Sequence, residues 1–181
     1  MTPEEDGPFA RTITGRIEWA RKMFRIYRDT LRADGETGRL AVDFNDARRA
    51  ARRASDSAGV SALCRMCDRE QGGSCCGAGI ELKYDGWMLL VNLVLGIELP
   101  ESRSRPGSCF FLGEKGCILA AREVLCINYL CRNVMEKVPF SEILALRELE
   151  GREIEILFRL NERIKRVIND RISPVPRRAP S

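Results

Sequence analysis

The chain has 181 residues, and its 44% hydrophobic and 31% charged residues are ordinary for a globular protein with a core of its own. Thirty basic residues are nearly matched by 26 acidic ones, which gives a formal net charge of +4. This small excess is no strong nucleic-acid signal, because domains built to bind nucleic acid usually carry a much larger basic surplus.

The start of the chain and its most apolar stretch argue against secretion and against a membrane span. The start, MTPEEDGPFA, is acidic and polar where a secretory signal is basic and then apolar. The stretch WMLLVNLVLGIEL, from Trp87, has 13 residues and contains Asn92, whereas a membrane-spanning helix needs about 20 apolar residues. We therefore expect a cytoplasmic protein, with a buried helix over residues 87–99.

Two helices are predicted before the first cysteine. Residues 9–34 carry a strong helical period, and ADGETG, with its two glycines, is expected to break this helix. A second helix is predicted from about residue 43 to 55, with Asp43 or Asn45 as its N-cap. Its arginines indicate either a patch for phosphate or acidic partners or, as we favour, a solvated helix face. They are Arg48, Arg49, Arg52 and Arg53.

Cysteine-rich loops and helices alternate in the rest of the chain. A first cysteine group is expected on a loop softened by Gly72 and Gly73, and the polar loop ESRSRPGS leads to a second group. After Pro139 the sequence predicts a long amphipathic helix over residues 141–172. We expect the N-terminal and C-terminal helices to pack over the cysteine-rich centre. The apolar stripe of the last helix is explained by this core face or, alternatively, by a homo-oligomer.

The predicted fold class is mostly α, a helical domain with a central cysteine-rich, loop-containing metal-binding segment, because no segment shows sustained period-two alternation. Four regions follow from the pattern. They are an N-terminal helical region (1–60), a cysteine-cluster metal-binding domain (61–133), a long C-terminal amphipathic helix (134–172) and a disordered tail (173–181).

Eight cysteines and no histidine define the chemistry of the sequence. The first group is Cys64, Cys67, Cys75 and Cys76, and the second is Cys109, Cys117, Cys126 and Cys131. Disulfides are rare in a reducing cytosol, and a thioredoxin-like pair needs a βαβ context that is missing here. The two-residue gap between Cys64 and Cys67 lets a tight turn aim both sulfurs at one ion. The clustered thiols therefore predict a metal site.

Two pairs of cysteines fit poorly on one tetrahedral ion. Neighbouring side chains diverge, so either one of Cys75 and Cys76 binds while the other packs, or the two serve different metals. On one continuous helix, Cys126 and Cys131 would lie about 140° apart around the axis and would share a site only if the helix broke between them. Cys126 is then the better ligand candidate and Cys131 a bystander.

All-thiolate ligation suits zinc and iron–sulfur clusters and disfavours magnesium and calcium. Without histidine the chain cannot form mixed Cys/His zinc sites, and it lacks the usual general base. The sequence does not separate zinc from a [4Fe–4S] cluster. The vicinal cysteines and a supply of ligands larger than one zinc ion needs favour the cluster.

The cysteine spacing over roughly residues 62–132 resembles that of the YkgJ-like cysteine-cluster family, which is described as having a zinc- or iron-chelating domain. The family's first box, C-x-x-C and then C-C, is matched by Cys64, Cys67, Cys75 and Cys76. Its second box is matched by Cys109 with Leu112, by Gly116 and Cys117, and by Arg122 with Cys126. Phe110 and Glu123 stand where that family usually has prolines.

Together these patterns predict a protein that chelates iron, as an iron–sulfur cluster, or zinc, with another protein as its partner. The predicted ligands are drawn from Cys64, Cys67, Cys75, Cys76, Cys109, Cys117 and Cys126. Arg122 either donates hydrogen bonds to a sulfur or carbonyl, or is a solvated surface residue. One alternative is a structural zinc module for protein–protein interaction. A similar box in flagellin lysine N-methylases implies a further alternative, a cluster-dependent protein-modifying enzyme or its accessory.

Overall fold

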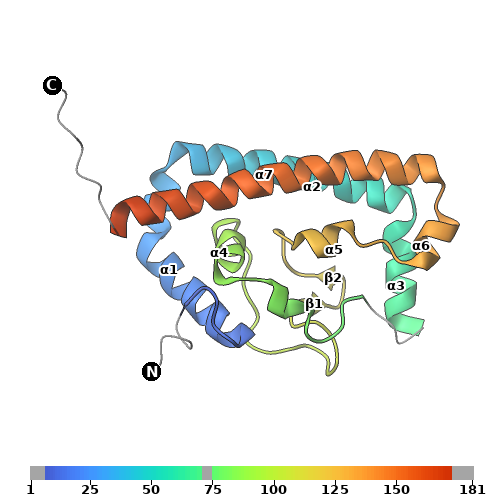
Figure 1. Ribbon diagram of the computed structural model, residues 1–181, viewed down its shortest axis with the longest axis horizontal. Helices are drawn as coiled ribbons and strands as arrows, with labels where there is room; N and C mark the ends of the chain where they lie inside the picture. The colour runs from blue at the N-terminus through green and yellow to red at the C-terminus, as the bar shows by residue number, and fades with distance from the viewer. Residues whose placement is uncertain (1–6, 71–74, 173–181) are drawn as a thin grey trace.

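The computed structural model describes residues 7–70 and 75–172, and of residues 68–70 the backbone alone. This part of the chain is mostly helical, as predicted (Figure 1). The elements in order are α1 (Ile13–Ala33), α2 (Gly35–Ser57), α3 (Val60–Glu70), the 3-10 helix η1 (Ile80–Lys83), α4 (Gly86–Val94), β1 (Leu112–Gly113), β2 (Gly116–Cys117), α5 (Val124–Asn128), α6 (Arg132–Lys137) and α7 (Phe140–Ile172). The predicted disordered tail, 173–181, lies outside the described residues.

A single residue, Asp34, separates α1 from α2. Its backbone is extended (φ −80°, ψ 102°), and its carboxylate accepts hydrogen bonds from the Thr37 N–H at 2.8 Å and the Thr37 hydroxyl at 2.6 Å. The prediction that the next helix starts only near residue 43 was wrong, since Gly35 and Gly38 both lie in α2. The aspartate cap and the packing of α2 on α7 compensate the roughly 1 kcal/mol that each glycine costs a helix.

The helices α2 and α7 lie side by side along the molecule (Figure 1). α7 confirms the helix predicted over residues 141–172. Its apolar stripe is buried within the chain, which is the core-face explanation, at Ile143, Leu146, Ile156, Leu157, Leu160, Ile164 and Ile168. Its main partner is α2, whereas α1 packs chiefly on α4, so the first helix is not the principal partner of the last.

The buried apolar helix is α4, which ends at Val94 and not at residue 99, and Gly96 follows it in the left-handed region (φ +81°). Asn92 on this helix is fully buried. Its side-chain amide donates to the carbonyls of Met88 (3.0 Å) and Ala121 (2.9 Å), and its oxygen accepts from the N–H groups of Ala120 (2.9 Å) and Ala121 (3.0 Å). Within the described ranges, no helix combines the length and apolar character that crossing a membrane requires.

The fold has two apolar clusters. The large core lies among α1, α2, α4, α7 and the segment from Cys109 to Ala121. The small core joins α3, α6 and the start of α7, and consists of Val60, Val134, Val138, Ile143 and Leu146.

Cys64 and Cys67 lie on helix α3, which corrects the prediction that the first cysteine group starts on a loop. Gly72 and Gly73, which suggested that loop, lie outside the described residues. The helix forms because VSALCRMC contains no helix breaker and because Val60 and Leu63 pack in the small core. Residues three apart share one face of a helix, so the spacing of this pair aims both sulfurs from a helix face and not from a tight turn.

Candidate metal centre

All eight cysteines are free thiols in the described part of the chain. Four of them belong to the large core or pack against it, one packs against the small core, and three are in neither cluster. The cysteines at the large core, here called the inner set, are Cys76, Cys109, Cys117 and Cys126. The remaining four, here called the outer set, are Cys64, Cys67, Cys75 and Cys131.

The inner set is assembled from four separate segments. Cys109 belongs to the large core and is 5% exposed, while the other three are partly buried and pack against that core. The N–H of Cys109 donates to the carbonyl of Cys76 at 2.6 Å, which fixes these two segments side by side. Cys117 is contributed by strand β2 and Cys126 by helix α5. Backbone pairing and one short helix thus hold four thiols against one apolar surface.

Two inner sulfurs already face backbone donors. Burial raises the pKa of the Cys109 thiol to about 11, and burial also raises the pKa of Cys117. In each case the N–H two residues further on, that of Phe111 or of Leu119, hydrogen-bonds the sulfur and partly offsets the rise in pKa. Such donors favour a charged thiolate over a neutral thiol. The environment is therefore apolar but carries the hydrogen bonds that metal-bound thiolates use.

Tyr84 provides the matching contact for Cys126, and nothing in the sequence indicated it. Burial raises the pKa of Cys126, and a hydrogen bond from the Tyr84 hydroxyl partly opposes this. The same hydroxyl accepts the Glu123 N–H at 3.2 Å. The ring is 1% exposed and stands edge-on to Phe111, with 5.2 Å between the ring centroids. Tyr84 therefore positions both the sulfur and the start of α5.

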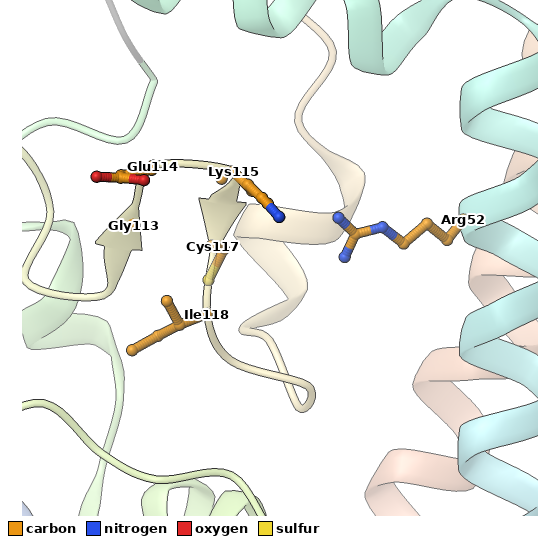
Figure 2. Close-up of a pocket in the computed structure, with 7 residues that line it drawn as sticks. Arg52, Gly113, Glu114, Lys115, Cys117 and Ile118 are labelled. Atoms are coloured by element: carbon orange, nitrogen blue, oxygen red, sulfur yellow. The ribbon is translucent and has the colours of Figure 1, made fainter.

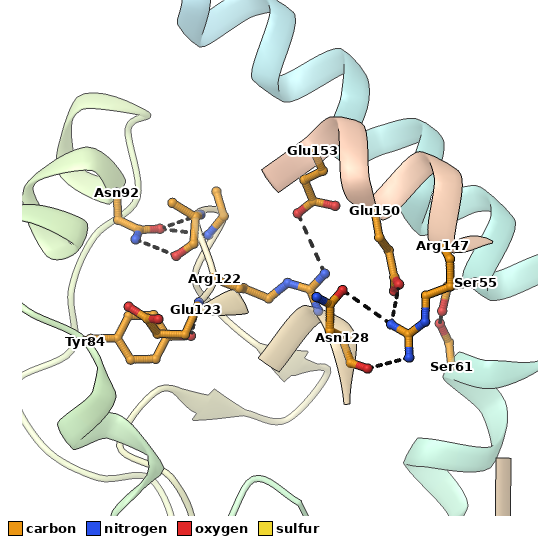
Figure 3. A network of polar contacts seen from close by, with 12 residues as sticks. Ser55, Ser61, Tyr84, Asn92, Arg122, Glu123, Asn128, Arg147, Glu150 and Glu153 are labelled. Carbon is orange, nitrogen blue, oxygen red and sulfur yellow. Dashed lines mark hydrogen bonds and ion pairs between the residues drawn. The ribbon is translucent and has the colours of Figure 1, made fainter. Parts of the chain in front are cut away.

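Arg122 makes an ion pair that the sequence did not indicate. Figure 3 shows its guanidinium pointing toward Glu153 of α7, with Nη2 3.8 Å from Oε1. Glu153 is fully buried, and among the described residues neither of its carboxylate oxygens has a hydrogen-bond partner. Burial raises the pKa of Glu153, and the charges of Arg122 and Arg48 work against that rise. Arg122 also lowers the pKa of Cys117, so it acts on the site as a nearby positive charge.

Arg48 is half-buried beside this pair, which corrects its assignment to a solvated helix face. That assignment holds for Arg49, Arg52 and Arg53, which are exposed. Arg48 differs because its position on α2 faces α7 and the buried Glu153.

Arg147 ties α5 to α7 (Figure 3). Its guanidinium donates to the carboxylate of Glu150 at 2.7 Å and to the carbonyl of Asn128, the last residue of α5. A helix of five residues cannot form by itself, so this contact helps to position Cys126.

The outer set is linked to the small core through Cys131 and helix α3. Cys131 caps the start of α6 and packs against that core, to which α3 contributes Val60. Burial raises the pKa of Cys64 and of Cys75, and for both the largest electrostatic contribution comes from Cys131. Cys131 thus lies close to thiols of the first sequence group, although it comes more than fifty positions later in the sequence.

Cys126 and Cys131 do not share a helix. α5 ends at Asn128 and α6 begins at Arg132, so the helix break considered in the sequence exists. The two cysteines nevertheless pack against different apolar clusters.

A cavity of about 360 Å³ opens beside Cys117. It is lined by Arg52 of α2 and by residues 113–118 of the β1–β2 hairpin. Figure 2 shows the side chains of Arg52 and Lys115 pointing toward each other across it. The cavity therefore has a cationic wall next to an inner thiol.

Within residues 7–70 and 75–172, no three Cys, Asp or Glu side chains stand close enough together to hold a metal ion. The thiols are neighbours that a bound ion would have to draw together. No family model, curated protein or solved structure matches this chain. The resemblance to the YkgJ-like family therefore depends on cysteine spacing and stays a prediction.

Proposed function

We propose that this chain is a metal-binding protein that chelates iron, as an iron–sulfur cluster, or zinc through cysteine thiolates. One observation carries the proposal: the inner set of four free thiols from separate segments, packed on one core with hydrogen-bond donors at three of the sulfurs. Cys109, Cys117 and Cys126 each receive such a bond. Core packing alone explains buried thiols but not donors directed at them.

The residues present fit a thiolate-bound metal in chemical type. A bound cation supplies the positive charge that stabilises thiolates in an apolar site. Tyr84 and the backbone N–H groups would hold the sulfurs in orientation, and Arg122 would balance part of the negative charge of the thiolates. Each thiol would release its proton to solvent on binding, because burial keeps Cys109 and Cys117 protonated at neutral pH.

The first test measures iron, zinc and acid-labile sulfide per chain on protein purified without oxygen, together with a visible spectrum. Equal iron and sulfide, with broad absorption near ~400 nm, would establish the iron–sulfur form. Stoichiometric zinc in a colourless sample would establish the zinc form. Neither metal, with all eight thiols free, would overturn the proposal.

Cys126→Ser, with Val124→Ser as its matched control, links the metal to the inner set. Val124 lies on the same short helix and is 44% exposed. We expect Cys126→Ser to lose metal and Val124→Ser to keep it. Equal metal content in both variants would remove Cys126 from the site.

A structural clasp is the second candidate function, favoured because the inner set joins four separate segments of the chain. Chelation should then lower helicity, and oxidant should change nothing while the metal stays bound. A redox cluster would instead bleach reversibly with dithionite. The methyl-transfer alternative gains no support from the cavity beside Cys117, whose charged lining mixes Arg52 and Lys115 with the carboxylate of Glu114.

A further inference from the structure

The outer set contains as many thiols as one tetrahedral ion binds. Structural zinc sites take four ligands, and without histidine those ligands here must be sulfurs. The eight cysteines divide into four at the large core and four others, so neither set needs a sulfur from the other. The apparent excess of ligands noted in the sequence therefore matches two sites.

Three of the outer thiols are carried by helix α3 or stand at the start of helix α6. Cys64 and Cys67 lie three residues apart on α3, and Cys131 lies at the first turn of α6. α3 and α6 pack directly against each other, with Val60 and Val134 buried between them. Cys75 is exposed, and the charges of Cys131, of its neighbour Cys76 and of Cys67 act on it, in that order.

The vicinal pair stands at the boundary between the two sets. The carbonyl of Cys76 accepts the Cys109 N–H at 2.6 Å, and the Cys76 side chain packs on the large core. Cys75 is exposed and packs on neither core. A pair of adjacent cysteines that separates in this way provides one sulfur for each site, which removes the strain of closing both on one ion.

We propose that Cys64, Cys67, Cys75 and Cys131 form a second four-thiolate site, which binds Zn²⁺ separately from the inner set. The inference rests on the proposed function, since it assigns a second centre of the same chemistry. Binding forms four Zn–S bonds and releases four thiol protons to solvent, with no change of oxidation state. Cys131, a bystander by sequence, becomes a ligand.

The outer sulfurs must move together for this site to close. Zn–S bonds of about 2.3 Å place tetrahedral sulfurs roughly 3.8 Å apart. A change of one χ1 rotamer moves a sulfur by roughly 3 Å. Binding coupled to local closure of this kind is common for thiolate zinc sites.

The test titrates reduced, metal-free full-length protein with Co²⁺ under anaerobic conditions, followed by displacement with Zn²⁺. Tetrahedral thiolate Co²⁺ absorbs in the visible range, so bound equivalents can be counted. We expect two equivalents for the wild type and one each for Cys131→Ser and Cys117→Ser. Arg132→Ala, a change next to Cys131 at a side chain that is 91% exposed, should keep two.

The outcomes separate this inference from the proposed function. Suppose that the wild type binds one equivalent of Co²⁺, that Cys117→Ser loses it and that Cys131→Ser keeps it. This result would overturn the outer site and leave the proposed function standing. No bound Co²⁺ or Zn²⁺ at all would overturn the outer site and the zinc form of the proposed function, while the iron–sulfur form is decided by the iron and sulfide content. If Cys131→Ser does not fold, alkylation of wild-type thiols at rising Zn²⁺ decides the question. The site is supported if the second equivalent of Zn²⁺ protects all four outer cysteines from alkylation together. It is refuted if these cysteines are still alkylated at saturating Zn²⁺.

Discussion

The α2–α7 pair and the segments that carry most of the cysteines differ in what holds them together. α2 and α7 have 23 and 33 residues, and each buries an apolar stripe along the other. α5, which carries Cys126, has 5 residues, and α6, which follows Cys131, has 6. Helices this short are unstable by themselves, because a few hydrogen bonds do not compensate the entropy of ordering them.

Single polar side chains on the longer elements hold these short segments. Asn92 of α4 binds the backbone at Ala120 and Ala121, and Arg147 of α7 binds the end of α5. The long helices are therefore held by a continuous apolar stripe, whereas the short segments near the cysteines depend on a few buried polar contacts. The difference shows how a stable helical frame can position short segments through single polar contacts.

Asn92→Leu should cause the largest loss, because it breaks the link between the two regions. The N–H groups of Ala120 and Ala121 and the carbonyl of Ala121 would stay buried without a partner. At roughly 1–3 kcal/mol for each such group, we expect the free energy of unfolding to fall by about 4 kcal/mol. Urea unfolding measures this loss, and hydrogen exchange should rise first in residues 117–126.

The control for this change is Asn169→Leu, an exposed position on α7, which should change stability by less than about 0.5 kcal/mol. If Asn92→Leu were as stable as this control, Asn92 would not be the link between the regions.

Leu160→Ala should weaken the long-helix pair and leave the site itself intact. Leu160 is fully buried on α7, and truncating it creates a cavity that costs about 3 kcal/mol of unfolding free energy. Leu144→Ala, on the same helix but 54% exposed, should cost far less. Both variants should bind the same amount of metal when folded. A change in metal stoichiometry in Leu160→Ala would show that the two regions are not separable.

The long helices were predictable from sequence because their stability depends on a repeated local pattern. The buried stripe of α7 follows a helical period over 33 residues, so one misjudged position changes little. The break after α1 was predicted, but α2 starts earlier than expected because the N-capping signal of Asp34 followed by Thr37 outweighs the two glycines.

The contacts around the thiols were not predictable, because each joins residues far apart in the sequence. Tyr84 meets Glu123 across 39 positions, and Asn92 meets Ala121 across 29. A lone tyrosine or a lone asparagine in an apolar stretch has no local signature of such a contact. The difference between Cys75, which is exposed, and Cys76, which packs on the large core, likewise depends on tertiary packing that spacing does not encode.

Asp34→Asn tests the polar anchor within the long-helix region. The hydrogen bond with Arg163 is the largest influence on Asp34 and holds its pKa well below the ordinary 3.8, while burial opposes this. A lowered carboxylate pKa contributes stability above pH 3.8, and that stability is lost as the pH falls below this value toward the folded-state pKa.

Asparagine keeps the N-cap and removes the charge, so at pH 7 we expect a loss of about 1.5 kcal/mol that shrinks steadily in acid below pH 3.8. Urea unfolding at a series of pH values measures the difference. Asp29→Asn, whose side chain is 84% exposed, serves as the control and should show no such pH dependence. A loss that stayed constant across the acid range would mean that the Asp34 charge is not its cause.

Tyr84→Phe should have the smallest effect and probes the site most directly. The change removes the hydroxyl that donates to Cys126 and accepts the Glu123 N–H, but keeps the ring edge-on to Phe111. Because the O–H donor stabilises the thiolate more than the thiol, the loss should be larger in metal-loaded than in metal-free protein, by about 1 kcal/mol. Competition with a chelator of known affinity should then show roughly fivefold weaker binding of the first metal equivalent at unchanged stoichiometry. Tyr129→Phe, at a ring that is 55% exposed, should bind as the wild type does. Equal affinities in Tyr84→Phe and Tyr129→Phe would place the bound metal away from Cys126, and would leave Tyr84 as a packing residue of the large core.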